Sequence, residues 1–409
     1  MKIGMITQWY EPETGSAAHP TAIARALAAS GHQVRVLTGY PSYPLGKLYD
    51  GYSMRLHTDE VLDGIPVRRV PDVPSHDRSA LRRAMTLTTF AASATAHVGW
   101  LRHADVCLVY LTPATVGVAA MALHRRWGVP YALYVQDLWP ETVTASGFVA
   151  HPGATRAIEA GLHRYLARLY RGAGGMAGIS PTMTRLLAER GARVPPISIP
   201  NWIDEDVFRP VPRSPRAVLD ERVWIMYAGG VGELQSLDTA VSAMSLLAER
   251  PDIGLAIVGD GVALPALRRQ AQEAGLDGRV RFLGHRPTAA MPELIAESSA
   301  QLVSLKDLPV FRGTIPSKVQ ASMACARPIV CAVAGDAADV VRRSGAGVVV
   351  QPEDSRYLAR AFREIADAGA EGRAAMGTRA RSAYLAELSA ASGVAALERM
   401  LQDAARGGP

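Results

Sequence analysis

The residues best suited to chemistry in this chain are glycines that can bring the backbone close to a phosphate group. Residues 227–238 read YAGGVGELQSLD, between an apolar run and a helical pattern. Gly229 and Gly230 there, and Gly15 and Ser16 near the N-terminus, would let N–H groups approach an anion beside a helix N-terminus. One such junction in each half favours an enzyme that closes two nucleotide-binding folds around a phosphorylated donor.

Two cations lie in the same half of the chain as the glycine junction at residues 227–238. Only four of the 44 basic residues are lysines, which makes a lysine in a loop context informative. Residues 311–318 read FRGTIPSK, so Arg312 and Lys318 flank a loop that leads into a helical pattern, with Ser317 beside them. Fixed cations and hydrogen-bond donors are what a diphosphate needs. The alternative is a solvated lysine at a helix end, and the context favours the phosphate contact.

Two acidic segments follow apolar runs. Asp137 and Glu141 come after residues 131–135, and Gly259 and Asp260 come after residues 253–258. Ligands of open α/β sheets bind at the carboxyl ends of strands, so these residues are candidates to contact a donor or an acceptor. Asp137 could instead cap a turn before the following proline, and Gly-Asp-Gly is a common turn.

His19, on the first turn of an expected helix, completes the catalytic candidates with Asp137 and Glu141. It could donate to phosphate or to an acceptor, although a lone histidine there is more often structural. Residues 204–206 read DED, like a metal-binding Asp-X-Asp motif, but acidic residues after a Pro-Asn step more readily cap a turn. This segment therefore does not by itself predict a metal site, and no His or Cys cluster has zinc spacing.

Short apolar runs alternate with helical patterns, which predicts two α/β doubly wound units with mostly buried parallel strands. The strand-like runs are Lys2–Ile6, Gln33–Thr38, Asp105–Tyr110, Tyr131–Val135, Arg222–Tyr227, Ile253–Val258, Arg279–Leu283, Gln301–Leu305 and Pro328–Cys331. A proline-rich window at 199–215 predicts the domain boundary. We expect domains at 1–200 and 201–380, with a helix at 381–409 that could pack back on the first domain.

Composition narrows the class of protein. Residues 1–200 hold 20 Lys and Arg against 13 Asp and Glu, whereas residues 201–409 hold 24 against 25. The basic first half favours an anionic acceptor or a membrane surface, although solvated arginine is the commoner explanation. The three cysteines lack paired spacing, which predicts buried thiols in the cytoplasm. Residues 84–101 predict a buried or membrane-facing helix rather than a membrane span.

Several segments in order resemble glycosyltransferase family 4, and most closely its bacterial aminosugar (fucosamine-type) branch. These segments are residues 8–19, 38–47, 136–141, 199–201, 258–261, 281–284 and 311–318. The resemblance implies two Rossmann-like domains in the GT-B fold and a retaining, metal-independent sugar transfer. Its only co-substrate would be a nucleoside-diphosphate sugar, with no further cofactor and no nucleic-acid partner.

The resemblance also implies roles for residues. It places the base near residues 281–286, including Arg286, and the diphosphate at residues 229–235, including Gln235, and at Arg312 and Lys318. The acceptor would lie on the first domain. It would be a small molecule, as in antibiotic assembly, or a lipid-linked saccharide reached from a cytoplasmic or peripheral membrane position.

Two departures from the family leave other functions open. Ala321 and Gly313 stand where the family carries glutamates that contact the nucleotide ribose and the donor sugar, and Glu233 stands in the glycine turn. The chain could therefore be a catalytically silent nucleotide-sugar-binding protein, or a nucleotide-sugar epimerase. If the product were inverted, a base would be needed, for which Asp137, Glu141 and His19 are the candidates.

Overall fold

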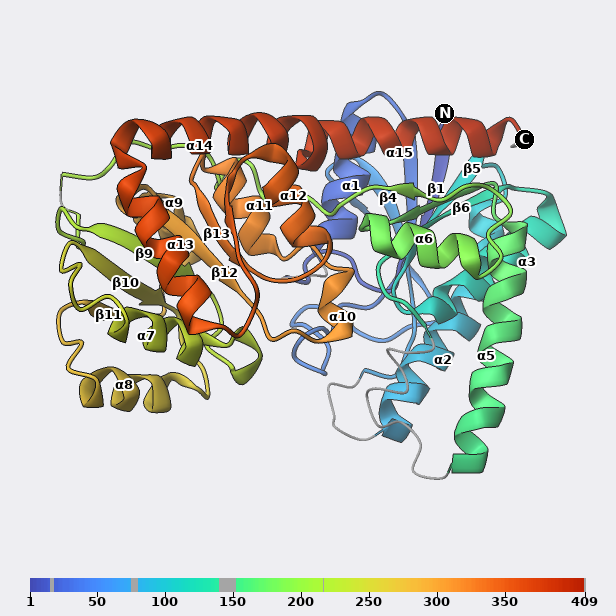
Figure 1. The fold of residues 1–409 in the computed structure, drawn as a ribbon. Helices are drawn as coiled ribbons and strands as arrows, with labels where there is room; N and C mark the ends of the chain where they lie inside the picture. Colours follow the sequence, from blue (N-terminus) through green and yellow to red (C-terminus); the bar gives the residue numbers. More distant parts are fainter. Residues whose placement is uncertain (15–17, 75–79, 140–151, 216, 408–409) are drawn as a thin grey trace. The chain divides into compact units, whose positions relative to one another are not determined.

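The computed structural model describes residues 1–14, 18–74, 80–139, 152–215 and 217–407. The chain forms two compact units. Unit 1 contains Met1–Ile199 and Val394–Pro409, and unit 2 contains Pro200–Gly393. Each unit is built on one sheet whose strands alternate along the chain with helices (Figure 1).

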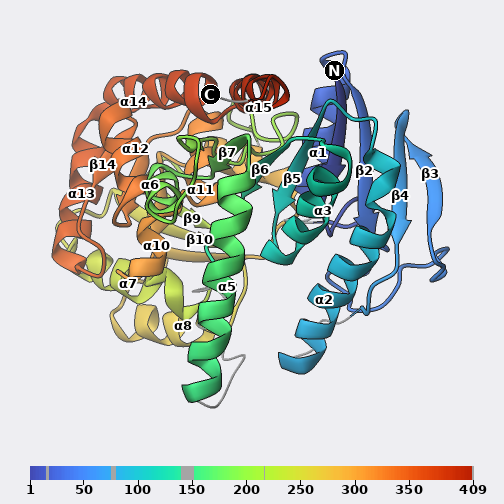
Figure 2. The same ribbon diagram turned by 90° about the vertical axis from the view of Figure 1, so that its right-hand side faces the viewer.

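Unit 1 has an eight-stranded sheet in the order β3-β4-β2-β1-β5-β6-β7-β8. Only the β3–β4 pair is antiparallel. The strands are β1 (Lys2–Ile6), β2 (Gln33–Gly39), β3 (Thr58–Leu62), β4 (Ile65–Val70), β5 (Val106–Leu111), β6 (Tyr131–Val135), β7 (Gly175–Gly178) and β8 (Ile197–Ser198). The helices are α1 (Ala18–Ala29), α2 (Ala80–His97), α3 (Gly117–Trp127), α5 (Pro152–Gly172), α6 (Pro181–Glu189) and most of α15 (Ala390–Ala405) (Figure 2).

Unit 2 has a six-stranded parallel sheet in the order β11-β10-β9-β12-β13-β14. The strands are β9 (Val223–Ala228), β10 (Ile253–Val258), β11 (Val280–Gly284), β12 (Ala300–Ser304), β13 (Ile329–Ala332) and β14 (Gly347–Val349). The helices are α7 (Leu237–Ser245), α8 (Leu264–Glu273), α9 (Met291–Glu297), α10 (Pro309–Arg312), α11 (Ser317–Ala324), α12 (Asp336–Ser344), α13 (Ser355–Asp367) and α14 (Gly369–Ala383).

The core of unit 2 lies on both faces of its sheet. In β9, Ile225 and Tyr227 pack among buried side chains of α7, α8 and α13, whereas Trp224 and Met226 pack on the opposite face with residues of α9. Successive side chains of a strand point to opposite faces, so an apolar run of this kind is buried throughout. The fold predicted from those runs, two doubly wound α/β units, is confirmed.

The nine predicted strands are all present, but five further strands were not predicted. β3 and β4 form a hairpin around Asp63 and Gly64, which have positive φ angles of 48° and 78°. β7 is made mostly of small residues, and β8 has only two. β14 has three residues. Such segments lack the long apolar run by which the other strands were found.

The segment 381–409, predicted to form a single helix, contains the end of α14, a short π-helical turn over Tyr384–Leu388, and α15. Within unit 1, α15 lies against β7. A Cβ atom added to Gly175 would approach Met400 Cγ to 2.7 Å, and one added to Gly174 would approach Ala404 to 3.2 Å. Glycines before and in β7 therefore allow the helix to pack this closely.

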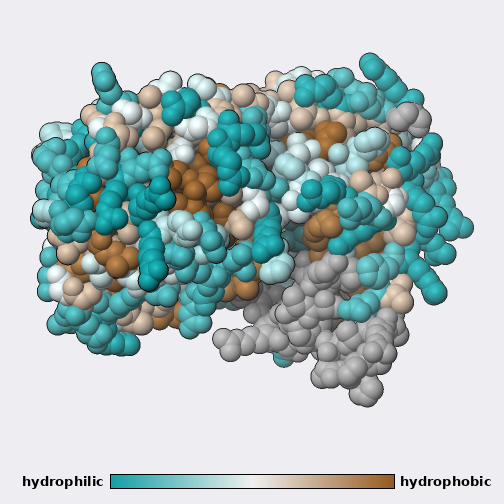
Figure 3. All heavy atoms as spheres, viewed as in Figure 1, coloured by the Kyte–Doolittle hydropathy of each residue, from teal (hydrophilic) through white to brown (hydrophobic). Residues whose placement is uncertain are grey.

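Among the described helices, none is both long enough and apolar enough to cross a membrane. In α2, Phe90 and Ala94 are buried, while Thr88 and Thr95 donate hydrogen bonds of 2.7 Å to carbonyls one turn earlier. These hydrogen bonds within the helix satisfy the threonine hydroxyl groups. Hydrophilic side chains predominate on the face shown in Figure 3, with hydrophobic ones in small patches. All three cysteines are buried free thiols, as predicted.

Candidate functional site

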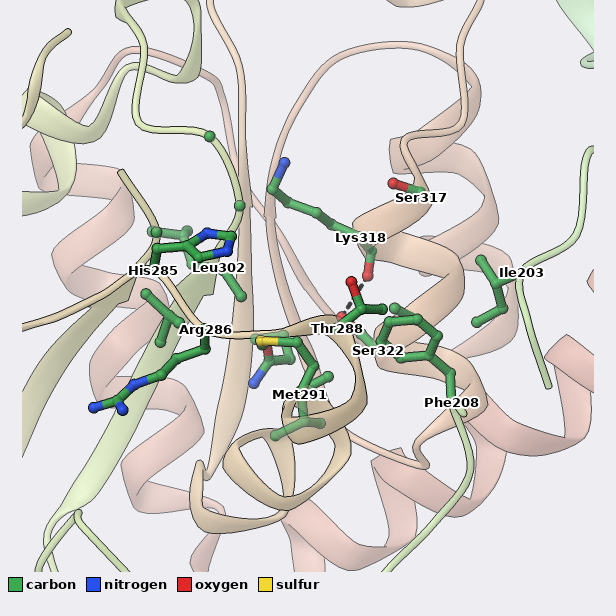
Figure 4. Close-up of a pocket in the computed structure, with 18 of the residues that line it drawn as sticks. Ile203, Phe208, His285, Arg286, Thr288, Met291, Leu302, Ser317, Lys318 and Ser322 are labelled. Atoms are coloured by element: carbon green, nitrogen blue, oxygen red, sulfur yellow. Dashed lines mark hydrogen bonds between the residues drawn. The ribbon is translucent and has the colours of Figure 1, made fainter. Parts of the chain in front are cut away.

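A cavity of about 420 Å³ lies at the carboxyl edge of the unit 2 sheet (Figure 4). Its walls come from the segments that follow three neighbouring strands, β9, β10 and β11, and from the first turns of α11. The apolar part is formed by Ile203, Phe208, Met291, Ile295 and Leu302. In an open α/β sheet this edge is where ligands bind.

Two glycines bring the loops after β9 and β10 into backbone contact. Gly229 and Gly259 have φ angles of +142° and +135°. A Cβ atom on Gly259 would lie 1.9 Å from the Gly229 carbonyl oxygen, which no side chain allows. The N–H of Gly229 donates to the carbonyl of Val258 at 2.9 Å. Glycine is therefore required here for close approach of two loops.

Replacing Gly259 with alanine is expected to destabilise unit 2 by about 2–3 kcal/mol, because it combines a strained φ angle with a backbone clash. Gly275→Ala is the matched control, since Gly275 has φ +64° and nothing within 4 Å of an added Cβ. Urea unfolding of both variants measures the difference. Equal stability of the two variants would contradict the role assigned to Gly259.

The glycine turn offers fewer free N–H groups than its sequence suggested. Val231 N–H donates to the Asp260 carbonyl at 2.9 Å, and Gly232 N–H donates to Gln235 Oε1 at 3.0 Å. With Gly229 also bonded, the Gly230 N–H is the one within residues 229–232 that has no partner among the hydrogen bonds of the described residues. The N-terminus of α11 supplies further donors, because the first N–H groups of a helix have no partner within it.

Lys318 is the charged group best placed to hold an anion. It lies in the first turn of α11, and its Nζ is 5.0 Å from the centroid of the Tyr227 ring. A Cβ atom on Gly229 would lie 2.9 Å from that Nζ, so the side chain extends over the glycine turn. Among the described residues no carboxylate lies within 4 Å of Lys318. Burial lowers its pKa. An unpaired, half-buried cation favours an anionic ligand.

The structure brings most of the predicted donor-binding residues together. Those that line the cavity are Gly229, Gly230, Gly259, Asp260, Arg286, Ser317 and Lys318. Arg286 is exposed and extends away from Lys318 in Figure 4. The cavity is therefore cationic near α11, with a second cation on the β11 side.

Two predicted donor-binding residues do not line the cavity. Gln235 uses its side-chain oxygen to cap the glycine turn, as described above. Arg312 is exposed and donates two hydrogen bonds of 3.0 Å to Asp307. The Asp307 carboxylate thus binds the Arg312 guanidinium, which was expected to contact the phosphate. Glu233 is exposed and also lies outside the cavity lining, so it does not oppose an anion there.

Other residues of the cavity were not singled out, although His285 lies within residues 281–286, where the base was expected. His285 and Thr288 follow β11, and Ser322 lies one turn after Lys318, where its Oγ donates to the Lys318 carbonyl at 2.6 Å. His285 directly follows the segment RFLG, which was a usable signal. Phe208 and Met291 gave no sequence signal, because the same apolar residue types line cavities and fill hydrophobic cores.

In unit 1, the predicted catalytic residues that can be described lie near the carboxyl edge of the sheet. Asp137 follows β6 and accepts a hydrogen bond from Thr112 Oγ1, which follows β5. The His19 ring lies with its centroid 5.8 Å from that of Tyr110 and 6.1 Å from that of Tyr134. Burial lowers the pKa of His19 to about 4, so the imidazole is neutral at pH 7. Gly15, Ser16 and Glu141 lie outside the described residues.

A buried polar cluster at the same edge was not predicted. The Glu13 carboxylate accepts hydrogen bonds from the N–H groups of Tyr10, Ser42 and Tyr43 at 2.7–3.0 Å. Asp72 Oδ2 accepts one from Gln8 Nε2 at 3.3 Å, and Asp72 Oδ1 has no partner among the described residues. Burial raises the pKa of Asp72 to about 7. The part of the chain that the structure describes contains no group of three metal-ligating side chains.

The sequence of this chain matches two family models and several known proteins. Residues 14–202 match the family model described as "Glycosyl transferase 4-like domain", and residues 222–368 match the one described as "Glycosyl transferases group 1". Probable glycosyltransferase WbjE of Pseudomonas aeruginosa is 26% identical over 275 residues, 65% of this chain and 67% of that protein. The putative colanic acid biosynthesis glycosyl transferase WcaI of Escherichia coli K12 is 28% identical over 326 residues, 75% of this chain and 77% of that protein.

Solved structures show the same fold. Anabaena Alr3699/HepE in complex with UDP has a TM-score of 0.69 at 16% identity, with 98% of this chain and 100% of that chain covered. Sucrose-phosphate synthase from Thermosynechococcus elongatus has a TM-score of 0.69 at 18% identity, with both chains covered completely. This chain thus consists of a glycosyltransferase 4-like domain followed by a group 1 domain, and it belongs to the glycosyltransferases of the GT-B fold.

Proposed function

We propose that this chain transfers a sugar from a nucleoside-diphosphate sugar to an acceptor and binds the donor in the unit 2 cavity. The observation that carries the proposal is Lys318, a half-buried cation that extends over the Gly229 turn and has no carboxylate partner among the described residues. A diphosphate would supply the missing negative charge. The complex of Anabaena Alr3699/HepE with UDP supports a nucleotide ligand for this fold.

In the proposed reaction, negative charge develops on the diphosphate as it leaves the sugar. The bond between the anomeric carbon and the phosphate oxygen breaks, and its electron pair stays on the diphosphate. Lys318, the Gly230 N–H and the N-terminus of α11 would stabilise that charge without reorganising. The oxygen, nitrogen or sulfur atom of the acceptor forms the new bond on the same face of the sugar, and the leaving phosphate takes its proton, which gives retention without a metal.

The nucleoside would occupy the rest of the cavity. Its apolar part, which includes Met291 and Ile295, suits a flat base, while His285, Arg286 and Thr288 supply polar groups after β11. Ala321 cannot accept a hydrogen bond from a ribose hydroxyl, and Ser322 Oγ is already bonded to the helix. We infer that affinity comes mainly from the diphosphate and the base. The resemblance to the fucosamine-type branch favours an aminosugar as the transferred group.

Unit 1 would bind the acceptor at the carboxyl edge of its sheet, near Asp137 and the neutral imidazole of His19. The acceptor would be a small molecule or a lipid-linked saccharide. We propose a cytoplasmic location, and Arg164, Arg168 and Arg171, which are exposed on α5, support peripheral contact with an anionic membrane surface.

Thermal unfolding with UDP, GDP, dTDP and ADP tests the donor proposal. A nucleotide that binds only the folded state raises the melting temperature, by a free energy that grows with the ratio of its concentration to Kd. We expect at least one of the four to do so, with no effect of a chelator. Failure of all four would contradict the proposed function.

Arg312→Ala is expected to reduce the nucleotide-induced shift in melting temperature less than Lys318→Ala does. Arg312 is exposed and engaged by Asp307, so it could reach a phosphate only after exchanging that partner. The same thermal assay compares the two variants, with Arg356→Ala, an exposed arginine at the start of α13, as the control. A larger loss for Arg312→Ala would assign the main phosphate contact to Arg312.

A further inference from the structure

A second cavity, of about 430 Å³, lies in unit 1 at the amino ends of its strands. Lys2 begins β1, Gln33 begins β2, and Trp100 and His103 lie in the segment before β5. Asp137, by contrast, follows the carboxyl end of β6. The cavity is therefore at the opposite edge of the sheet from the proposed acceptor residues, and the proposed transfer reaction does not use it. The N-terminus of the chain marks this edge in Figure 2.

An aromatic wall of this cavity is held in place by two arginines. The guanidinium carbons of Arg35 and Arg68 lie 5.7 and 5.0 Å from the centroid of the Trp100 ring. Arg68 is fixed in turn by two hydrogen bonds, of 2.7 and 2.6 Å, to Asp59. Stacking on an aromatic face orders an arginine that would otherwise be mobile. Arg35 is thereby presented at the cavity, which it lines together with Trp100.

Two cationic side chains line the cavity, while Asp59 and Glu60 line a neighbouring cavity that shares Arg35 and Trp100. The two cations are Lys2 and Arg35, and neither has a carboxylate within 4 Å among the described residues. No aspartate or glutamate belongs to its lining. The nearby Asp105 carboxylate accepts a hydrogen bond from the backbone N–H of Lys2 at 2.7 Å. The floor is formed by Ile3, Gly4, Leu101 and Ala104, which are apolar or small, and His103 lines the cavity beside them.

We propose that this cavity binds a phosphate group carried on a flat or apolar body. Lys2 and Arg35 would hold the phosphate, because guanidinium and ammonium groups form strong charge-assisted hydrogen bonds with phosphate oxygens. Trp100 and the floor would contact the body. Such a ligand is either a free phosphorylated metabolite or the headgroup of an anionic phospholipid. In both cases the contact is made at the edge of unit 1 that the transfer reaction leaves unused.

The test uses the full chain with Lys318→Ala, which weakens the proposed donor site, and AMP as the free probe. We expect calorimetry to find AMP binding in Lys318→Ala, a loss of about tenfold or more with added Arg35→Gln, and quenching of tryptophan fluorescence that disappears in Trp100→Phe. Arg126→Gln is the matched control. Arg126 also stacks on a tryptophan, Trp127, at 4.9 Å, but it does not line the cavity.

Sedimentation with phosphatidylglycerol vesicles distinguishes the two sources of phosphate. AMP binding that depends on Arg35 identifies a free metabolite, and vesicle binding that depends on Arg35 without AMP binding identifies a lipid headgroup. Arg35 is exposed, so its variant is expected to keep the wild-type melting temperature. The proposal is overturned if Lys318→Ala binds neither probe, or if Arg35→Gln and Arg126→Gln behave alike. Either result leaves the nucleotide assay on the wild type, and hence the proposed function, unaffected.

Discussion

Lys318→Ala is expected to weaken the binding of the preferred nucleoside diphosphate by about 10- to 150-fold, which corresponds to the 1.5–3 kcal/mol of a hydrogen bond to a charged group. The reason is that the Lys318 side chain extends over the glycine turn, with its Cε 2.6 Å from the Cβ position of Gly229. Calorimetric titration measures the affinity directly.

Lys306→Ala is the matched control for this prediction. Lys306 follows β12 and does not line the cavity, so its loss removes one positive charge from unit 2 without removing the proposed contact. A similar decrease in affinity for both variants would mean that general charge, rather than the position of Lys318, attracts the nucleotide.

The affinity of the wild type should also depend on pH. Burial lowers the pKa of Lys318, and a bound diphosphate would favour its protonated form. Affinity should therefore fall as the pH rises through this lowered pKa. In Lys318→Arg the cation stays charged, so its affinity should lack that decrease.

Asp72→Asn is expected to stabilise unit 1 most strongly in alkaline solution. The pKa of Asp72 is raised to about 7 in the folded state from 3.8. The folded state thus binds the proton more tightly, so the stability that this proton gives is present below pH 3.8 and is lost as the pH rises to 7. The advantage of Asp72→Asn over the wild type should grow by about 2–3 kcal/mol between pH 5 and pH 8.

Urea unfolding at pH 5 and pH 8 measures this difference. Asp50→Asn is the control, because Asp50 is an exposed carboxylate in the same unit. If the stability advantage of Asp72→Asn were the same at both pH values, the buried carboxyl group would not be titrating in this range.

The sequence allowed most of the fold to be predicted, because long apolar runs such as Tyr131–Val135 and Ile253–Val258 can be satisfied only by strands buried on both faces. It did not allow prediction of the β3–β4 hairpin. There Thr58–Leu62 is half exposed and lies at the sheet edge, so its pattern does not differ from that of a polar loop.

The cavity could be predicted in part for a related reason. Gly229, Gly259 and Lys318 carry local signals, namely a turn, a close approach and a rare lysine. Whether a residue such as Arg312 reaches the cavity depends on a competing partner, Asp307, and sequence spacing does not decide between the two. Likewise, the N–H of Gly229 was expected to face an anion but is used by Val258 in the backbone of the turn.

A crystal structure of this chain with the preferred nucleoside diphosphate tests the central claim most directly. The account predicts a diphosphate oxygen at about 3 Å from Lys318 Nζ, with another near the Gly230 N–H. It would be contradicted by a nucleotide bound outside the unit 2 cavity while Lys318 remained stacked on Tyr227 without an anion.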